Sequence, residues 1–234
     1  MAMRASNNPS APWILANAAG FVMGGAIAAV VVLAGEEPLV GTVRSQASAA
    51  AALAPVTAVS LGLFGVLVGL AQWLVLQRWW SITGWWIAAT AGGWAAAGAI
   101  AGTLSGFLSG TVTGVGPGIG VGGYVLGTLG AMAAIAVVPG VLQSLVIRHR
   151  VGGLGWPAAH LAGQGAGFLV AFPVMLLVAS RLRLNLPSPE AWVVAGFLWG
   201  TVFGIVTWKV ALARAFARLP GPRAASARSG RATG

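Results

Sequence analysis

Long apolar stretches dominate the order of residues along this chain. An α-helix needs roughly 20 apolar residues to cross a bilayer core about 30 Å thick. The chain contains six stretches of that length with few charges inside them, and this pattern predicts an all-α polytopic membrane protein with six transmembrane helices. In order, the stretches cover about residues 12–34, 51–76, 84–108, 120–147, 156–180 and 191–212.

The two ends of the chain are interpreted separately. A cleaved signal peptide is the alternative for the first stretch, because Arg4 precedes it. Its apolar part is longer than the usual h-region of about 7–15 residues, which favours a retained span. Residues 220–234 are rich in Gly, Ala, Ser and Arg and predict a disordered basic tail. We therefore expect a transmembrane domain over residues 1–219, followed by this tail.

Charge supports a membrane location. Only 7% of the residues are charged, whereas soluble domains have about 25%. The formal net charge is +10, and the basic residues lie at the ends of the apolar stretches and in the tail. Such positions are typical of a protein that faces an anionic leaflet, so we expect membrane lipids and not nucleic acid as partners. The absence of cysteine excludes disulfides and thiolate chemistry.

The distribution of Lys and Arg predicts the orientation. If the N-terminus is inside, ten of these residues lie on the inner side and three, Arg44, Arg181 and Arg183, lie outside. The three acidic residues also fall outside. By the positive-inside rule, we expect a multi-pass protein of the bacterial inner membrane with both termini in the cytoplasm.

Most tryptophans lie near the predicted inner ends of the helices. Indole prefers the headgroup boundary, so this distribution favours an aromatic belt at the inner interface over a stacking site for a ligand. The eight residues are Trp13, Trp73, Trp79, Trp80, Trp85, Trp86, Trp156 and Trp208, out of eleven tryptophans in the chain.

An internal repeat divides the chain. Residues 69–92 and 140–163 share nine identities over 24 positions without a gap, at an offset of 71 that pairs Trp85 with Trp156. Weaker matches extend the pattern to both ends of the apolar region. We expect three tandem hairpins with a pseudo-threefold axis along the membrane normal, unlike an inverted repeat. The hairpins cover about residues 12–76, 84–147 and 156–212.

Small residues recur at every fourth position in several predicted helices. Such stripes let backbones approach closely in lipid. We interpret them as helix contacts within the chain, and contact with a partner subunit is the alternative. The repeat-equivalent amides of Gln72 and Gln143 are interpreted as polar contacts between helices, with ligand binding as the alternative. The stripes include Gly98, Gly102 and Gly106 in the third helix and Gly196, Gly200 and Gly204 in the sixth.

His160 is the candidate for binding a cofactor. It lies about one turn inside the fifth helix, where the repeat alignment places Asn17 and Ala89. An imidazole can ligate the metal of a haem or of a chlorophyll-type pigment. The alternative is a hydrogen bond within the bundle, either to a backbone carbonyl or to Gln143.

Other candidate chemistry is sparse. Arg78, Arg148 and Arg150 predict a basic inner rim that binds lipid phosphate, with docking of an acidic partner as the alternative. No pair of carboxylates, no Ser/His/Asp set and no metal-ligand cluster can be assembled from the sequence. We therefore expect a protein that is not an enzyme.

A family resemblance rests on residues 69–78, which read Gly-Leu-Ala-Gln-Trp-Leu-Val-Leu-Gln-Arg, and on Trp85-Trp86. The segment resembles multi-pass membrane proteins of Chloroflexota and cyanobacteria that carry repeated Gln-Trp-Leu-Val-Leu-Arg and Trp-Trp elements. Gln77 stands where that pattern has Arg, and Ser144 replaces Trp73 in the second copy. The resemblance implies no activity. Because phototrophs are common among such organisms, it favours a subunit of a photosynthetic or electron-transfer complex.

These observations lead to two hypotheses of function. The first is a non-enzymatic accessory or structural membrane subunit that packs within a larger complex, or with itself, and contacts lipids or pigments. The alternative is a small transporter or channel with a path along the pseudo-threefold axis. A channel needs polar groups along a continuous path, and few are available in the apolar stretches.

Overall fold

The computed structural model describes residues 9–36, 46–80, 82–112, 120–151, 154–182, 189–213 and 215. This part of the chain is helical, with short turns, and six of its helices are long and apolar enough to span a membrane, which confirms the predicted fold class. The tail predicted for residues 220–234 lies outside the described residues. The helices are α1 (Ser10–Glu36), α2 (Gln46–Leu76), α3 (Trp85–Val112), α4 (Gly120–Val151), α5 (Gly155–Leu182) and α6 (Pro189–Thr207), which continues as the π-helix η2 (Trp208–Leu212).

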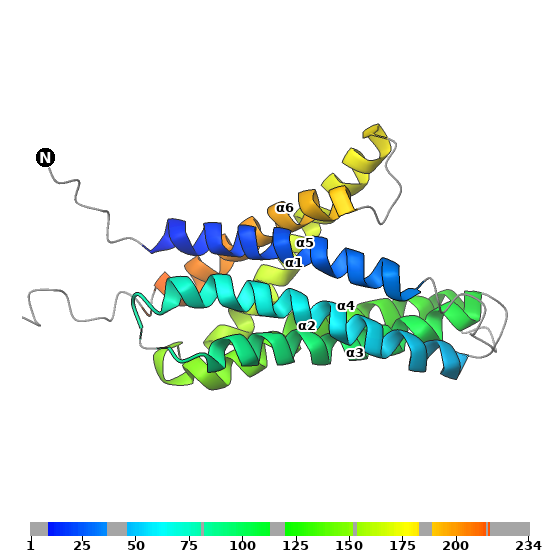
Figure 1. Cartoon of the computed structure of the whole chain (residues 1–234), viewed down its shortest axis with the longest axis horizontal. Helices are drawn as coiled ribbons and strands as arrows, with labels where there is room; N and C mark the ends of the chain where they lie inside the picture. The colour runs from blue at the N-terminus through cyan, green and yellow to red at the C-terminus, as the bar shows by residue number, and fades with distance from the viewer. Residues whose placement is uncertain are drawn as a thin grey trace, which may run out of the picture.

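The six helices close into a ring. Each helix packs against its neighbours in the sequence, and α6 returns to pack against α1. We call the end where α1, α3 and α5 begin the tryptophan end, on the left in Figure 1, and the opposite end the far end. Towards the far end, α5 and α6 diverge from α3 and α4 (Figure 1). The ring is therefore least tightly closed between α4 and α5, which also form its smallest interface.

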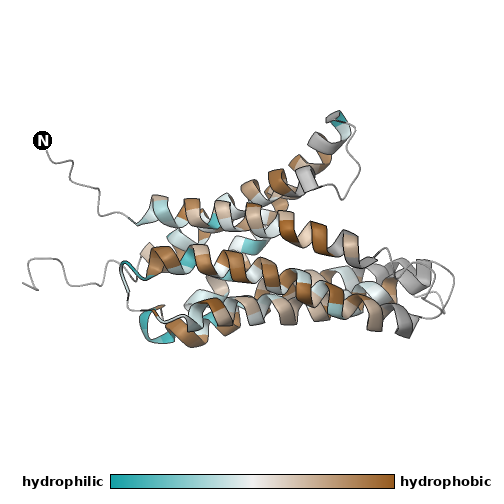
Figure 2. Ribbon diagram, in the orientation of Figure 1, coloured by the Kyte–Doolittle hydropathy of each residue, from teal (hydrophilic) through white to brown (hydrophobic). Residues whose placement is uncertain are grey.

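The outer surface of the ring is apolar. Large hydrophobic side chains are exposed on all six helices, among them Leu15, Leu126 and Leu169, which are 66%, 71% and 73% exposed. Hydrophobic residues recur along the length of the helices in Figure 2, and strongly hydrophilic ones lie mainly at helix tips such as the basic end of α4. A surface of this kind is solvated by hydrocarbon, as expected for an integral membrane protein.

The glycine stripes of α3 and α6 face other helices of the same chain. A Cβ atom at Gly98 or Gly102 would overlap backbone atoms of α2, and the Thr57 hydroxyl donates a hydrogen bond to the Gly98 carbonyl at 2.7 Å. The remaining glycines of the stripes are also buried. Glycine is needed at Gly98 and Gly102 because the backbones approach too closely for a side chain. On α6, Gly196, Gly200 and Gly204 face Phe21, Asn17 and Ile14 of α1 in the same way.

Candidate functional site

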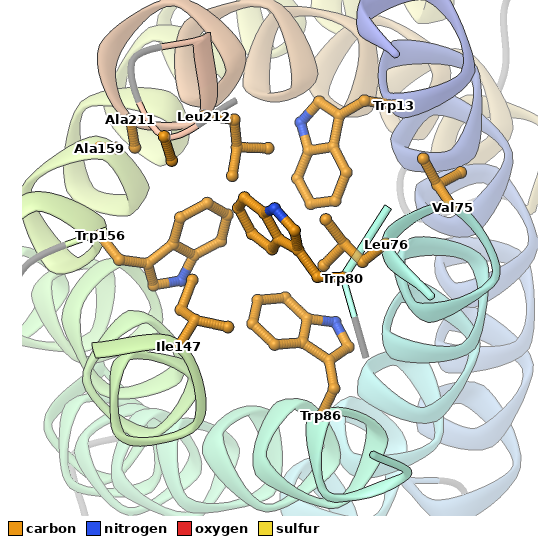
Figure 3. Packing of buried hydrophobic residues seen from close by; sticks show 11 residues of the cluster. Trp13, Val75, Leu76, Trp80, Trp86, Ile147, Trp156, Ala159, Ala211 and Leu212 are labelled. Carbon is orange, nitrogen blue, oxygen red and sulfur yellow. The ribbon is translucent and has the colours of Figure 1, made fainter. Parts of the chain in front are cut away.

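Tryptophan side chains fill the centre of the helical ring at the tryptophan end. Trp13, Trp86 and Trp156 come from α1, α3 and α5 and surround Trp80, which follows α2 (Figure 3). All four side chains are buried, and Trp156 packs edge-on against Trp13 and Trp86 with centroid distances of 6.0 and 5.6 Å. The predicted aromatic belt is therefore wrong for these four residues: they form a core. Trp85, 73% exposed, is placed as a belt residue would be.

Each of the three surrounding indoles donates a hydrogen bond to the preceding helix around the ring. The acceptors lie near the ends of α2, α4 and α6, the helices that return to the tryptophan end. Such bonds satisfy the indole N–H away from water and join neighbouring hairpins. The bonds run from Trp13 Nε1 to Thr207 Oγ1 at 3.1 Å, from Trp86 Nε1 to Gln72 Oε1 at 3.2 Å and from Trp156 Nε1 to Gln143 Oε1 at 2.9 Å.

The two glutamines link these bonds into one network. Gln143 Nε2 donates to Gln72 Oε1 at 3.2 Å and to Thr90 Oγ1 at 2.9 Å. Gln72 Nε2 donates to Asn17 Oδ1 at 2.8 Å, and Asn17 in turn donates to the Trp13 carbonyl. The network reaches all six helices, and the side-chain oxygens of both glutamines accept hydrogen bonds from indoles. We therefore interpret this network as a structural core that holds the helices together.

The register of the repeat differs by one residue from the sequence alignment. Gln72 bonds Trp86, 14 residues later, whereas Gln143 bonds Trp156, 13 residues later. The partner of Trp156 in the repeat is thus Trp86, and the alignment with Trp85 is wrong. Consequently Thr90, and not Ala89, corresponds to His160. The glycines agree with this register, because the residues that a Cβ would meet at Gly69, Gly140 and Gly204 include Thr90, His160 and Asn17 respectively.

A signal for this register exists in the sequence. Residues 13–20 and 86–93 share Trp, Ile, Ala, Ala and Gly at equal spacing, which is a better match than the one that starts at Trp85. The tandem repeat itself stays a prediction. The symmetry of the three hairpins as whole units stays a prediction.

His160 lies on α5 and is buried against α4 and α6. Its Nδ1 lies 2.9 Å from the Ala136 carbonyl oxygen of α4, which can only accept, and its ring meets Phe203 edge-on at 5.0 Å. A bond to a backbone carbonyl is what the structural interpretation of this residue predicts. His160 also lines neither of the two cavities described below. Ligation of a haem or pigment stays a prediction.

The three arginines of the predicted basic rim lie at the tryptophan end. Arg78 follows α2, and Arg148 and Arg150 are in the last turn of α4. All three are exposed, so they can reach phosphate groups at a membrane surface. The binding of lipid headgroups itself stays a prediction.

Beyond the aromatic core, towards the far end, the ring contains a partly open central cavity of about 430 Å³. Side chains of α1, α2, α3, α4 and α6 line it, and its walls are mostly apolar, with Phe64, Trp94 and Ile135 among them. The hydroxyls of Thr57 and Ser60, which also line it, already donate to backbone carbonyls of neighbouring helices. This cavity offers mostly apolar space, and two of its hydroxyl groups are already engaged within the fold.

A second cavity, of about 470 Å³, lies between α4, α5 and α6, and we call it the lateral cavity. Trp199 and Ile135 line both cavities and so separate them. The lateral cavity is lined in part by Gln164, which follows His160 by four residues on the same face of α5. Among the described residues, Gln164 Nε2, Gln164 Oε1 and Trp199 Nε1 are buried without a hydrogen-bond partner.

Comparison with known proteins gives no relative. No protein-family model matches the chain, and neither a curated protein nor a solved structure matches it. The resemblance to multi-pass proteins of Chloroflexota and cyanobacteria stays a prediction. The structure and the apolar surface define the class of the molecule as a multi-pass α-helical membrane protein.

Proposed function

We propose that this chain is a non-enzymatic accessory subunit of a larger membrane complex and holds apolar molecules, lipids or pigments, between its helices. The observation that carries the proposal is the pair of mostly apolar cavities between the helices, with volumes of about 430 and 470 Å³. Ligand sites commonly have volumes of roughly 300–1,000 Å³ and mostly apolar walls. The buried amides of Asn17, Gln72 and Gln143 are instead engaged in the network of the tryptophan end.

The composition of the cavity walls supports a passive role in binding. No charged side chain is among the described residues that line them. Within the described part of the chain, no group of three or more acidic or histidine side chains could hold a metal ion. The walls can therefore select a molecule by shape and by a few hydrogen bonds, which suits binding and assembly.

Purification from native membranes under mild conditions tests this proposal. We expect the chain to migrate with other membrane subunits or with a second copy, and solvent extraction to release apolar molecules in fixed stoichiometry. An absorption spectrum of the wild type and of His160→Leu shows whether a pigment is bound through the imidazole. A protein that purifies alone, as a monomer and without bound molecules, contradicts the proposal.

The closed ring of helices supports a second candidate function, that of a small transporter or channel. The central cavity lies inside the ring and is lined by five of the six helices. The buried indoles of Trp13, Trp80, Trp86 and Trp156 close the ring at the tryptophan end. Flux of small solutes through wild-type proteoliposomes that stops when the central cavity is filled by Ala101→Phe supports this function, and absence of flux contradicts it.

We further propose that the tryptophan end faces the bacterial cytoplasm. Both α1 and η2 have an end there, so the chain enters and leaves the ring on one side. The exposed Arg78, Arg148 and Arg150 lie at this end, as the positive-inside rule requires of the cytoplasmic face. Single cysteines at Gln77 and His149 are expected to react with a membrane-impermeant maleimide only from the cytoplasmic side.

A further inference from the structure

The side chain of Gln164 stands out among the buried polar groups of the described structure. It is only 2% exposed, and neither its amide nitrogen nor its amide oxygen has a hydrogen-bond partner. The other buried amides, those of Asn17, Gln72 and Gln143, all take part in hydrogen bonds. A buried polar group without a partner destabilises a protein by about 1–3 kcal/mol, so its presence needs an explanation.

Gln164 lines the lateral cavity together with a second unpartnered group. Trp199 of α6 lines the same cavity, and its Nε1 is buried without a partner among the described residues. A Cβ atom at Gly167, one turn after Gln164 on α5, would lie 2.7 Å from this nitrogen. The indole nitrogen thus packs against α5 at a residue three positions after Gln164, a rise of roughly 4.5 Å along the helix axis. Together the two side chains carry three N–H groups and one amide oxygen without a partner among the described residues.

The rest of the lateral cavity is apolar. Its walls include Met132, Ile135, Phe168 and Met175. A buried water is stable where about two to four polar groups surround it, and the hydrocarbon region of a membrane supplies none. With no charged group in the wall, an ionised ligand would have no counter-charge. These walls favour a neutral molecule that brings its own polar atom.

The lateral cavity can be reached from the hydrocarbon region. Leu161 and Phe172 line it and are also 49% and 42% exposed on the apolar outer surface of α5. Towards the far end, α4 and α5 diverge (Figure 1), and the cavity lies between these helices. Gln164 is nine residues after the start of the span Gly155–Leu177, which places it roughly 14 Å along a helix at 1.5 Å per residue. It therefore lies deep in the bilayer, beyond the reach of lipid headgroups.

We propose that the lateral cavity binds a neutral, membrane-soluble molecule whose head carries a carbonyl or hydroxyl oxygen and whose apolar body lies among the side chains of α4 and α5. A carbonyl oxygen accepts from Gln164 Nε2 and Trp199 Nε1. A hydroxyl group accepts from one of them and donates to Gln164 Oε1. Phe168, Phe172 and Trp199 provide aromatic faces for a planar head. This inference adds a site and a ligand chemistry to the proposed function. It rests on the proposed function only in assuming that the chain holds apolar molecules between its helices.

The test uses three probes with the full chain in lipid nanodiscs. Decyl-1,4-benzoquinone carries carbonyl oxygens, decylhydroquinone carries hydroxyls, and decylbenzene has a ring and chain without oxygen. A ligand of the folded state raises the melting temperature by an amount that depends on its dissociation constant. We expect a saturable rise with at least one oxygen-bearing probe and none with decylbenzene. A rise of equal size with decylbenzene overturns the proposal, because the cavity is then only an apolar void, and so does the absence of a rise with every probe.

Variants then separate the site from the stability of the fold. Gln164→Met keeps the shape of the side chain, and we expect it to raise the dissociation constant about tenfold while leaving the melting temperature without probe unchanged or higher. The exposed Gln77 supplies the matched control Gln77→Met, which should bind as the wild type does. Unchanged binding by Gln164→Met, or a melting temperature without probe that falls as far as that of Gln143→Met, overturns the proposal.

A second pair of variants covers the possibility that Gln164→Met does not fold. Trp199→Phe removes one donor and keeps an aromatic wall, and Trp85→Phe changes an exposed tryptophan as its control. We expect only Trp199→Phe to weaken binding, and equal binding by both variants overturns the proposal. These results are distinct from those of the proposed function, since a chain that purifies without partners can still bind the probes through Gln164.

Discussion

Gln143 and Gln164 are two buried glutamines on neighbouring helices, and their surroundings are opposite. Gln143 donates to Gln72 and Thr90 and accepts from Trp156, whereas Gln164 has no partner among the described residues. The difference follows from where the helices converge. At the tryptophan end, polar groups from all six helices lie within hydrogen-bond distance of one another. Between α4 and α5 the helices diverge, and no described residue supplies a hydrogen-bond partner for the Gln164 amide.

This comparison shows that a buried glutamine can have two different roles in one helical bundle. In an apolar medium a saturated network of amides and indoles fixes which helices are neighbours. An amide that the fold leaves unsatisfied destabilises the free protein and remains available to a molecule from outside the chain. The tryptophan end therefore specifies the structure, and the lateral cavity is the part of the interior where binding is expected.

The most damaging change should be Gln143→Leu. It leaves the Trp156 N–H without its acceptor and removes donors from Gln72 and Thr90, so we expect a loss of about 3 kcal/mol in the free energy of unfolding. Unfolding in detergent micelles with increasing dodecyl sulfate measures this loss, and Gln77→Leu, at an exposed glutamine, is the control. Equal stability of the two variants would mean that the network contributes nothing to the fold.

A smaller loss is expected for Gly102→Leu, which tests whether α2 and α3 remain close beyond the tryptophan end. A side chain at this position would overlap the Leu53 carbonyl and Thr57, so overpacking should lower the free energy of unfolding by about 1–3 kcal/mol. The control is Gly92→Leu on the same helix, where a Cβ atom meets nothing within 4 Å. If both variants unfold alike, the helices are loose on this side of the ring as well.

The adjacent tryptophans of α3 provide a finer test of the register. Trp86→Phe removes the N–H that Gln72 accepts, and because Gln72 still accepts from Gln143, we expect a loss of only about 1.5 kcal/mol. Trp85→Phe should have almost no effect, since Trp85 is 73% exposed. Thermal unfolding of the two variants in the same detergent decides between the registers. A larger effect at Trp85 would restore the alignment at an offset of 71.

The smallest effect, and the only one of opposite sign, is expected for Gln164→Met. Removing an unsatisfied amide from an apolar wall should leave the ligand-free protein equally stable or stabilise it by up to about 1 kcal/mol. The same substitution at Gln143 should destabilise the protein, which makes the pair a direct comparison of the two environments. Chemical unfolding of both variants after removal of bound lipid provides the measurement. A clear loss of stability in Gln164→Met would show that this amide has a partner within the fold.

Hydrophobic patterning predicts most of this fold. With η2 counted as the end of α6, the six apolar stretches lie within or within a residue of the six helices, because burial in hydrocarbon and helix formation depend on the same run of residues. The observed helices extend further, as in α2, which begins at Gln46 and not near residue 51. Polar and small residues at the ends lower the hydropathy without ending the helix.

The partners of individual side chains are harder to predict. Gln72 and Gln143 stand out in the sequence because they are polar and repeated, but the choice of Trp86 over Trp85 depends on a single residue in a connection. Gln164 gives even less signal. Its sequence context is no different from that of a bonded glutamine, and its lack of a partner depends on the angle at which α4 and α5 separate, which local sequence does not determine.

The hydrogen bond between Trp13 and Thr207 joins residues 194 positions apart in the chain. The indole of the first helix therefore has no Thr207 acceptor until the sixth helix has been inserted. The contact between α1 and α6 closes the longest loop in the chain and therefore has the largest entropy cost. We expect it to form last in folding. The completed ring therefore differs from an unfinished one at a defined atom: a chain that stops before α6 leaves the Trp13 N–H without its Thr207 acceptor.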